Sequence, residues 1–265
     1  MSILTEIAVR TKERIEEEKF KVPPRVLMSQ LNSELAKQAK EKQSFLEALK
    51  APGMSYICEV KKASPSKGLI APDFPYLNIA REYESAGASA VSCLTEPFYF
   101  QGSDRYLQEI AKAVSIPVLR KDFTVDEYMI YQAKAFGASA VLLICAILDN
   151  ARLKAFGQLA QELGLDALVE VHDEWEMDRA LNLDAKLIGV NNRNLHDFTV
   201  DMENSVRLRR MAPQDTVFVS ESGIKTAEDI RILYHNKVDA VLIGETLMRS
   251  PDKKAALEEL NKETA

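Results

Sequence analysis

The sequence predicts a single (β/α)8 barrel, the TIM-barrel architecture, with a helical extension before its first strand. Three observations lead to this prediction. The chain has 265 residues, and a barrel of this kind needs about 250. Short apolar runs alternate eight times with longer amphipathic segments. The short runs are continuously apolar, as expected for parallel strands that are buried on both faces.

The extension is expected to cover residues 1–50 and the barrel residues 51–265, and together they are expected to form one domain. Apolar residues recur at helical spacing over residues 2–20, which predicts an amphipathic helix that ends before two consecutive prolines. A second helix is expected over residues 29–49, where a Pro-Gly pair follows.

The apolar runs are the expected barrel strands, and the amphipathic segments are the expected helices. We expect strands at residues 56–61, 90–94, 118–121, 140–145, 167–171, 187–191, 217–221 and 240–244. We expect helices at residues 77–85, 106–114, 127–136, 151–163, 174–181, 204–211, 227–236 and 253–261. The run Gly-Ala-Ser-Ala-Val occurs at 87–91 and again at 137–141, which favours a repeated unit. The alternative, an open doubly wound sheet, usually has a Gly-x-Gly-x-x-Gly turn, and this sequence has none.

Composition and charge argue against several classes of function. The formal net charge is −6, so nucleic-acid binding is not expected, and an anionic substrate needs locally placed Lys or Arg. No apolar run approaches the roughly 18 residues of a membrane span, and the N-terminus lacks the apolar core of a signal peptide. We therefore expect a soluble, cytoplasmic chain. Cys58, Cys93 and Cys145 include no Cys-x-x-Cys pair and are expected to be buried free thiols, with no metal site.

Charged side chains gather at the expected carboxyl ends of the strands, where a parallel barrel has its active site. Glu59 and Lys61 are two positions apart and therefore share a face, as do Asn191 and Arg193. A charge that points into a barrel is costly unless it is paired or used. We predict that these side chains form one active site at this end of the barrel, and the alternative is a structural network of ion pairs. The charged members of the active site would be Glu59, Lys61, Lys121, Glu170 and Arg193.

The ends of the last two strands predict a phosphate site. Ser222, Gly223 and Gly244 follow these strands, which is the usual position of a phosphate site in a barrel. Glycine allows close approach of the backbone, and N–H groups at the start of a helix attract an anion. Each glycine alone is more often part of a tight turn, so the prediction depends on their occurrence at both strand ends.

The run at residues 57–68 contains Glu-x-Lys-x-x-Ser-Pro-Ser and closely resembles the signature of the indole-3-glycerol-phosphate synthase family. Further runs resemble the family in the same order along the chain, at residues 94–96, 99–103, 119–123, 167–172, 189–195 and 220–224. The resemblance covers nearly the whole chain, including the extension. It implies a carboxy-lyase of tryptophan biosynthesis that converts 1-(2-carboxyphenylamino)-1-deoxyribulose 5-phosphate to indole-3-glycerol phosphate, carbon dioxide and water. It implies neither a metal nor an organic cofactor.

The resemblance also implies roles for individual residues. Lys121 matches the general acid that protonates the substrate carbonyl oxygen, and Lys61 would bind the anthranilate carboxylate. Which lysine donates the proton in each step stays open. Glu170 matches the base of the dehydration, while Glu59 and Asn191 would hold hydroxyls and orient the lysines. A neighbouring cation such as Arg193 is expected to lower the pKa of a lysine toward the working pH.

The other implied residues would bind the substrate. Ser64, Ser222, Gly223 and Gly244 would contact the phosphate. Arg193 would bind the substrate as well, and an apolar pocket of Phe100, Phe123, Leu142 and Leu195 would press the ring against the carbonyl. Ordinary packing is the alternative for these four apolar residues. Glu245 stands where some members have a serine that contacts phosphate, so it is left out of the site.

The histidines are not assigned to the site, because a lone histidine is more often a surface or packing residue. They are His172, His196 and His235. The nearest rival function is another phosphate-binding barrel enzyme, such as a phosphoribosylanthranilate isomerase, but the run at residues 57–68 argues against it. A non-catalytic binding barrel is expected to lack Lys121 or Glu170, and both are present. The chain ends shortly after the last helical pattern, so we expect no second activity in it, and we expect a monomer or weak dimer.

Overall fold

The computed structural model describes residues 3–31, 43–194 and 197–262. Eight parallel strands form a closed barrel in the order β1-β10-β9-β8-β7-β6-β5-β4. The strands are β1 Ser55–Val60, β4 Ala90–Leu94, β5 Val118–Lys121, β6 Ala140–Ile144, β7 Asp166–Val171, β8 Leu187–Asn191, β9 Val217–Glu221 and β10 Ala240–Ile243. The predicted (β/α)8 barrel is confirmed, and the ends of the predicted strands differ by one residue at most.

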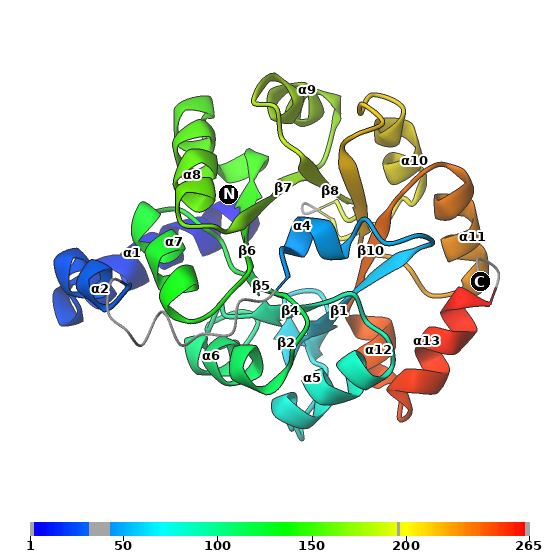
Figure 1. Ribbon diagram of the computed structural model, residues 1–265, viewed down its shortest axis with the longest axis horizontal. Helices are drawn as coiled ribbons and strands as arrows, with labels where there is room; N and C mark the ends of the chain where they lie inside the picture. The colour runs from blue at the N-terminus through cyan, green and yellow to red at the C-terminus, as the bar shows by residue number, and fades with distance from the viewer. Residues whose placement is uncertain (1–2, 32–42, 195–196, 263–265) are drawn as a thin grey trace.

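Helices surround the barrel, as Figure 1 shows. They are α5 Tyr76–Ser85, α6 Asp104–Ala113, α7 Glu127–Ala135, α8 Asn150–Glu162, α9 Glu174–Asn182, α10 Glu203–Arg209, α11 Ala227–His235 and α13 Lys253–Asn261. A polar side chain caps the start of most of them by accepting a backbone N–H, as Asp173 does for α9 and Thr226 for α11. The predicted helices are confirmed, with ends within two residues.

The repeated Gly-Ala-Ser-Ala-Val run has the same structure at both of its positions. Gly87 and Gly137 both have positive φ, of 92° and 83°, and end the helix before the strand. The hydroxyl of Ser89 accepts the N–H of Tyr56 at 3.2 Å, and that of Ser139 accepts the N–H of Val118 at 3.4 Å. Each serine therefore ties its own strand to the preceding one.

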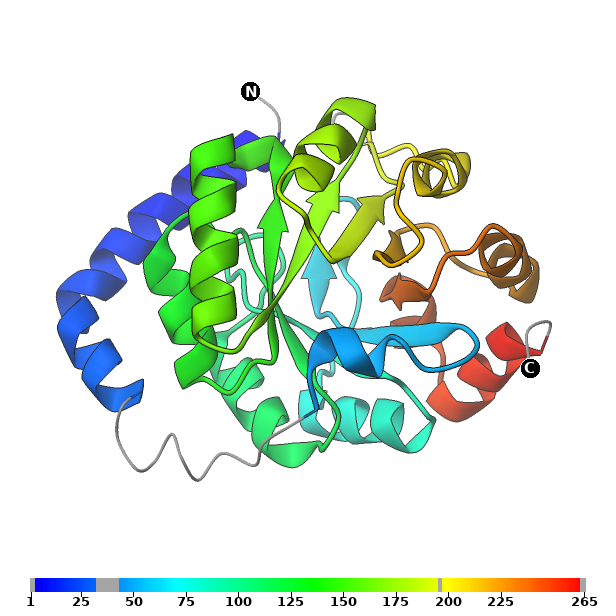
Figure 2. The same cartoon turned by 45° about the horizontal axis from the view of Figure 1, so that its top comes forward.

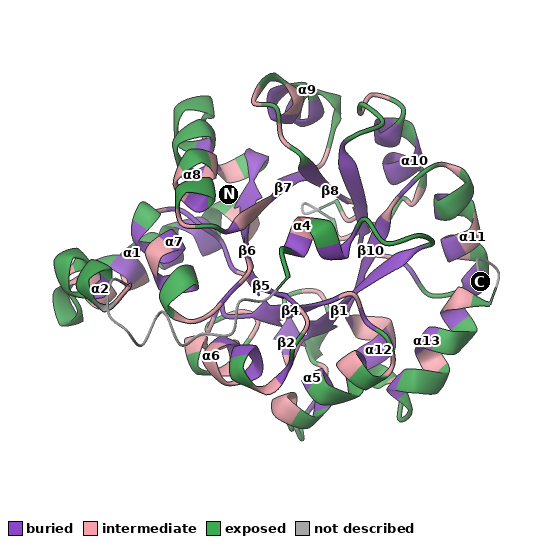
Figure 3. Ribbon diagram, in the orientation of Figure 1, coloured by how far each residue is buried: buried purple, intermediate pink, exposed green. Residues whose placement is uncertain are grey.

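Two apolar cores follow from the alternation of side chains along each strand. One fills the barrel and includes Ile57, Leu119, Leu168, Val219 and Leu242. The other lies between the strands and the surrounding helices and contains the free thiols Cys58, Cys93 and Cys145, whose predicted burial is confirmed. Figure 3 shows buried strands, and helices whose outer faces are exposed.

The extension contacts both ends of the barrel (Figure 2). Helix α1, Ile3–Lys21, begins near the carboxyl ends of the strands and is followed by α2, Pro24–Leu31. The short helix α4, Phe45–Ala48, closes the opposite end, where Phe45 is fully buried in the inner core.

The prediction of one helix over residues 29–49 was wrong. Helix α2 begins earlier, because Pro24 suits the first turn of a helix. Gln43 and Ser44 are not helical, and the Ser44 hydroxyl accepts the N–H of Glu47 at 3.3 Å as the N-cap of α4. The same hydroxyl donates to Asp166 at 2.7 Å, which fixes this cap against the barrel. Residues 32–42 of the predicted helix lie outside the described residues.

Four short elements were not predicted. The strands β2, Ala63–Ser64, and β3, Gly68–Leu69, form a small hairpin after β1. A 3-10 helix, Cys145–Ile147, follows β6, and the helix α12, Glu245–Arg249, follows β10. Among the described residues, no helix is long and apolar enough to span a membrane.

Candidate active site

A cavity of about 830 Å³ lies at the carboxyl ends of the strands. Every predicted site residue within the described part of the chain lines it, while Leu195 lies outside the described residues. These residues are Glu59, Lys61, Ser64, Phe100, Lys121, Phe123, Leu142, Glu170, Asn191, Arg193, Ser222, Gly223 and Gly244. The barrel therefore brings together side chains from both ends of the sequence.

Lys121 lies between two buried carboxylates. Its Nζ is 2.9 Å from Oε2 of Glu170 and 3.2 Å from Oε2 of Glu221. Lys121 and Glu221 are the last residues of β5 and β9, and Glu170 is the last but one of β7, so the closed barrel brings alternate strands together around one point. A lysine held between two carboxylates is positioned to give up a proton and regain it.

A second lysine–carboxylate pair lies on β1 and just beyond it. Lys61 Nζ is 2.5 Å from Oε1 of Glu59, so the expectation that these two side chains share a face is confirmed. Gly244 packs against this pair. A Cβ atom at position 244 would collide with the carboxylate of Glu59 and lie 2.7 Å from Lys61 Nζ. The absence of a side chain at this position therefore makes room for the pair.

Asn191 connects Glu170 to the turn at Ser222. Its Nδ2 donates to Oε1 of Glu170 at 3.2 Å. Its Oδ1 accepts the hydroxyl of Ser222 at 2.9 Å and the backbone N–H of Arg193 at 3.1 Å. Both ends of the amide are thus used, which fixes its orientation.

The charged groups around Lys121 shift one another's pKa values. Burial alone would lower the pKa of Lys121, but the charges of Glu170, Glu221 and Glu59 outweigh it and raise that pKa. Burial and the charges of Glu170 and Glu59 raise the pKa of Glu221 to about 7, although Lys121 opposes them. Burial alone would raise the pKa of Glu170, but Lys121 and His172 outweigh it, so that pKa is lowered.

The expectation that Arg193 lowers the pKa of a catalytic lysine is not met at Lys121, because carboxylates and not cations surround its amine. The Arg193 guanidinium instead donates to the carbonyl of Phe198 at 3.2 Å. The chain leaves β8 at Asn191, and Arg193 pairs with Val200 in an isolated bridge. Arg193 therefore lies at the rim of the cavity.

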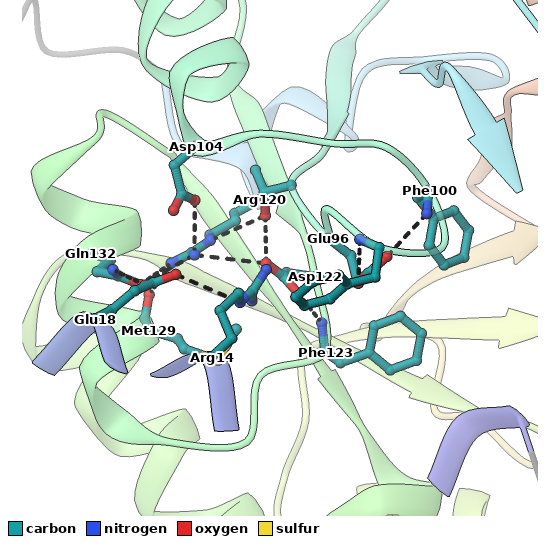
Figure 4. A network of polar contacts seen from close by, with 12 residues as sticks. Arg14, Glu18, Glu96, Phe100, Asp104, Arg120, Asp122, Phe123, Met129 and Gln132 are labelled. Atoms are coloured by element: carbon teal, nitrogen blue, oxygen red, sulfur yellow. Dashed lines mark hydrogen bonds and ion pairs between the residues drawn. The ribbon is translucent and has the colours of Figure 1, made fainter. Parts of the chain in front are cut away.

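One wall of the cavity is apolar. The rings of Phe100 and Phe123 are 6.1 Å apart and tilted by 39°. The carboxylate of Glu96 accepts backbone N–H groups of the loop that carries Phe100, including that of Phe100 itself at 3.0 Å (Figure 4). Ile3, Leu4 and Ile7 of α1 also line the cavity. The extension thus covers part of the site.

A buried polar network joins α1 to the end of β5 (Figure 4). Asp122 accepts hydrogen bonds from Arg14 at 2.9 Å and from the hydroxyl of Thr95 at 2.7 Å. The fully buried Arg120 donates to Asp104 at 2.9 Å and to the carbonyl of Met129 at 2.7 Å. The strand end that carries Lys121 is therefore fixed on the outside of the barrel.

The residues predicted to bind phosphate all line the cavity. Ser222 and Gly223 have positive φ, of 68° and 94°, so the chain turns sharply after β9. Glu245 also lines the cavity, and its carboxylate lies 3.1 Å from Arg249 and 3.7 Å from Lys67. These cations balance the charge that we expected to oppose a phosphate.

A family model described as "Indole-3-glycerol phosphate synthase" matches residues 4–260. The chain belongs to the indole-3-glycerol phosphate synthase family. The indole-3-glycerol phosphate synthase of Ruminiclostridium cellulolyticum is 53% identical over 259 residues, which cover 97% of this chain and 98% of that protein. The one of Endomicrobium trichonymphae is 53% identical over 258 residues, which cover 97% of this chain and 99% of that protein.

Solved structures of lower identity share the barrel. A 3-hexulose-6-phosphate synthase has a TM-score of 0.64 at 17% identity, with 80% of this chain and 100% of that chain covered. The 3-hexulose-6-phosphate synthase of Salmonella typhimurium has a TM-score of 0.65 at 11% identity, with 79% and 97% covered. At such identities the likeness extends to the fold alone.

Two side chains next to the predicted residues were not assigned from the sequence. Glu221 is 2% exposed and lies beside Lys121. Its signal was present, because Val219, two positions earlier, lies in the inner core and strand alternation places Glu221 inside as well. The other is His172, whose Nε2 is 3.4 Å from Oε1 of Glu170.

Proposed function

We propose that this chain catalyses ring closure, decarboxylation and dehydration of 1-(2-carboxyphenylamino)-1-deoxyribulose 5-phosphate to indole-3-glycerol phosphate. The observation that carries this proposal is the position of Lys121. Its amine lies between Glu170 and Glu221, in a cavity with an apolar wall on one side and the turn at Ser222 on another. Family membership over residues 4–260 supports it.

The first step forms the carbon–carbon bond. The ring carbon that bears the carboxylate attacks the carbonyl carbon of the ribulose chain, and the carbonyl oxygen takes a proton from Lys121. The bond to the carboxylate then breaks, carbon dioxide leaves, and its electron pair restores the aromatic ring. Lys61 holds the carboxylate until it departs. The apolar wall, with Phe100 and Phe123, presses the ring against the carbonyl.

The second step removes water. The hydroxyl formed in the first step takes a proton from one of the two lysines and leaves as water, and Glu170 accepts the proton that the neighbouring carbon releases. Glu59 and Asn191 hold the sugar hydroxyls and the catalytic side chains in place. Ser64, Ser222, Gly223 and Gly244 bind the phosphate through hydroxyl and backbone N–H groups. Arg193 contacts the substrate at the rim, and Leu195 is a further substrate-binding residue.

The proposal is tested by indole fluorescence after the purified chain is mixed with the substrate. The wild type should form product, and Lys121→Ala should lower kcat by about 10²- to 10⁴-fold, because a general acid contributes that much. Lys186→Ala is the matched control, since Lys186 is exposed and pairs with Asp184 on the surface. A folded wild type that forms no product would overturn the proposal.

We further propose a cytoplasmic enzyme that folds as one domain over residues 1–265 and acts as a monomer or weak dimer. Its partner is the phosphorylated small molecule, with neither nucleic acid nor membrane involved. Sedimentation velocity over a range of concentrations tests the oligomeric state, and a stable larger assembly would contradict it.

A further inference from the structure

His172 is held in one orientation beside Glu170. Oε2 of Glu176 accepts the backbone N–H of His172 at 2.8 Å and lies 3.0 Å from its Nδ1. The side-chain amide of Asn204 donates to the carbonyl of His172 at 3.0 Å. Helices α9 and α10 therefore fix both the ring and the backbone of this residue.

The fixed ring points its other nitrogen at the base. Nε2 of His172 is buried and makes no hydrogen bond of good geometry within the described part of the chain, although it lies 3.4 Å from Oε1 of Glu170. An ionised Glu176 can only accept, so Nδ1 carries a proton. Without a second proton, Nε2 would direct its lone pair at a carboxylate. With a second proton, it places a positive charge 3.4 Å from Glu170, and this imidazolium charge stabilises the carboxylate.

The two carboxylates on Lys121 have unequal surroundings. Oε1 of Glu170 lies near two further donors, Asn191 at 3.2 Å and His172 at 3.4 Å. Oε1 of Glu221 is buried and has no hydrogen-bond partner among the described residues. A buried charged oxygen without a partner is more costly than a buried neutral one. If Glu170 and Glu221 hold one proton between them, we therefore expect it on Glu221.

We propose that His172 is a positioning residue that gives these two carboxylates different roles, so that Glu170 is the base and Glu221 carries the exchangeable proton. The inference rests on the proposed function, and it adds the group that decides which carboxylate accepts a proton from the substrate. His172 also lines a second cavity of about 510 Å³, which shares Asn191 and Arg193 with the main one. The ring thus has its own path for exchanging its proton.

The carboxylates around His172 agree with this assignment. Burial alone would lower the pKa of His172, but the hydrogen bond with Glu176 and the charges of Glu170, Glu176 and Glu221 outweigh it and raise that pKa. The other charged groups nearby are Lys121, which pairs with Glu170, and Asp173, Arg193 and Asp201, which line the second cavity.

The first experiment needs no substrate. The chain has three histidines, so protein labelled with 15N-histidine gives few ring signals, and His172→Gln identifies the one that matters. We expect His172 to titrate above the ordinary histidine value, and its midpoint to fall in Glu170→Gln and in Glu176→Gln. Glu174→Gln is the matched control on α9, because Glu174 pairs with Arg207 at the surface. A midpoint that Glu170→Gln leaves unchanged would overturn the inference.

The second experiment measures turnover against pH. In His172→Gln the acidic limb of the kcat profile should move to higher pH, because Glu170 loses a neighbouring positive charge. A move of one pH unit lowers kcat on that limb by about tenfold. KM should stay within about twofold, because His172 does not line the main cavity. An equal loss of kcat at every pH would indicate a structural role and overturn the inference.

The two proposals fail in different ways. A wild type without turnover would overturn the proposed function, and the histidine titration would still decide the role of His172. A normal wild-type profile that His172→Gln does not shift would overturn only the inference.

Discussion

Arg14 and Asp122 form a buried ion pair of 2.9 Å although 108 positions separate them in the chain. Asp122 stands between Lys121 and Phe123, so this contact ties the extension to the strand end that carries the proposed acid and part of the apolar wall. Burial alone would raise the pKa of Asp122, but Arg14 and Arg120 outweigh it and lower that pKa. The pair therefore contributes stability at neutral pH, and this contribution is lost as the pH falls through the lowered pKa.

Replacing Arg14 with Met should lower the free energy of unfolding by about 3 kcal/mol, because it removes the nearer of the two cations beside the buried Asp122 charge and leaves only Arg120, at 3.7 Å. Urea denaturation at pH 7 measures the loss. In Arg14→Met combined with Asp122→Asn, the loss should be smaller than the sum of the two single losses. Arg10→Met is the control, since Arg10 is exposed on the same helix and stacks on Phe98. Equal losses in the two single arginine variants would contradict this account.

Gly189 makes room for Glu221 inside the barrel. A Cβ atom at position 189 would collide with the carboxylate of Glu221 and lie 3.2 Å from Cδ1 of Leu168. Gly189→Ala should therefore displace Glu221 from Lys121 and lower kcat by about tenfold or more, since a misplacement of about 1 Å is costly. Gly157→Ala is the matched control, because a Cβ there meets nothing within 4 Å and helix α8 gains stability. Similar kcat values for the two variants would rule out the proposed role of Gly189.

Replacing Phe45 should lower the stability of the fold without changing catalysis. It is fully buried at the end of the barrel opposite the cavity. Phe45→Ala should cost about 3–5 kcal/mol of unfolding free energy, while KM and the turnover of the folded fraction stay near the wild-type values. Phe20→Ala on α1 is the control, because Phe20 is 91% exposed and its loss should cost about 0.5 kcal/mol or less. Denaturation and steady-state kinetics on the same samples separate the two effects.

Local patterns in the sequence were enough to predict the barrel. Each strand is a continuous apolar run, because both of its faces are buried, and its ends follow from where that run stops. Strand alternation likewise placed Glu59 and Lys61 on one face, and the structure has them in contact. The same alternation places Glu221 inside the barrel, because Val219, two positions earlier, lies in the inner core.

Contacts between distant segments account for what the sequence did not predict. The start of α4 depends on Asp166, which accepts a hydrogen bond from Ser44 122 positions earlier. Arg193 shares a face with Asn191 only while the strand continues, and β8 ends at Asn191. The surroundings of Glu245 depend on Lys67, which a different loop supplies. Local periodicity carries no information on such contacts.

Glu221 should make the protein less stable as the pH rises. An unfolded glutamate has a pKa of about 4.3. In the folded chain, burial and the charges of Glu170 and Glu59 raise the pKa of Glu221 to about 7, so the folded state binds this proton more tightly. Its contribution is therefore full below about pH 4.3 and is lost as the pH rises through about 7.

Glu221→Gln cannot ionise, so it should lose less unfolding free energy than the wild type between pH 5 and pH 8, by about 1–3 kcal/mol. Lys121→Met should change the dependence in the opposite direction, because it removes the cation that lowers the pKa of Glu221. Urea denaturation of the three proteins at several pH values measures both effects. If the wild type and Glu221→Gln changed in parallel, Glu221 would carry no proton in this range, and the assignment of the base to Glu170 would lose its support.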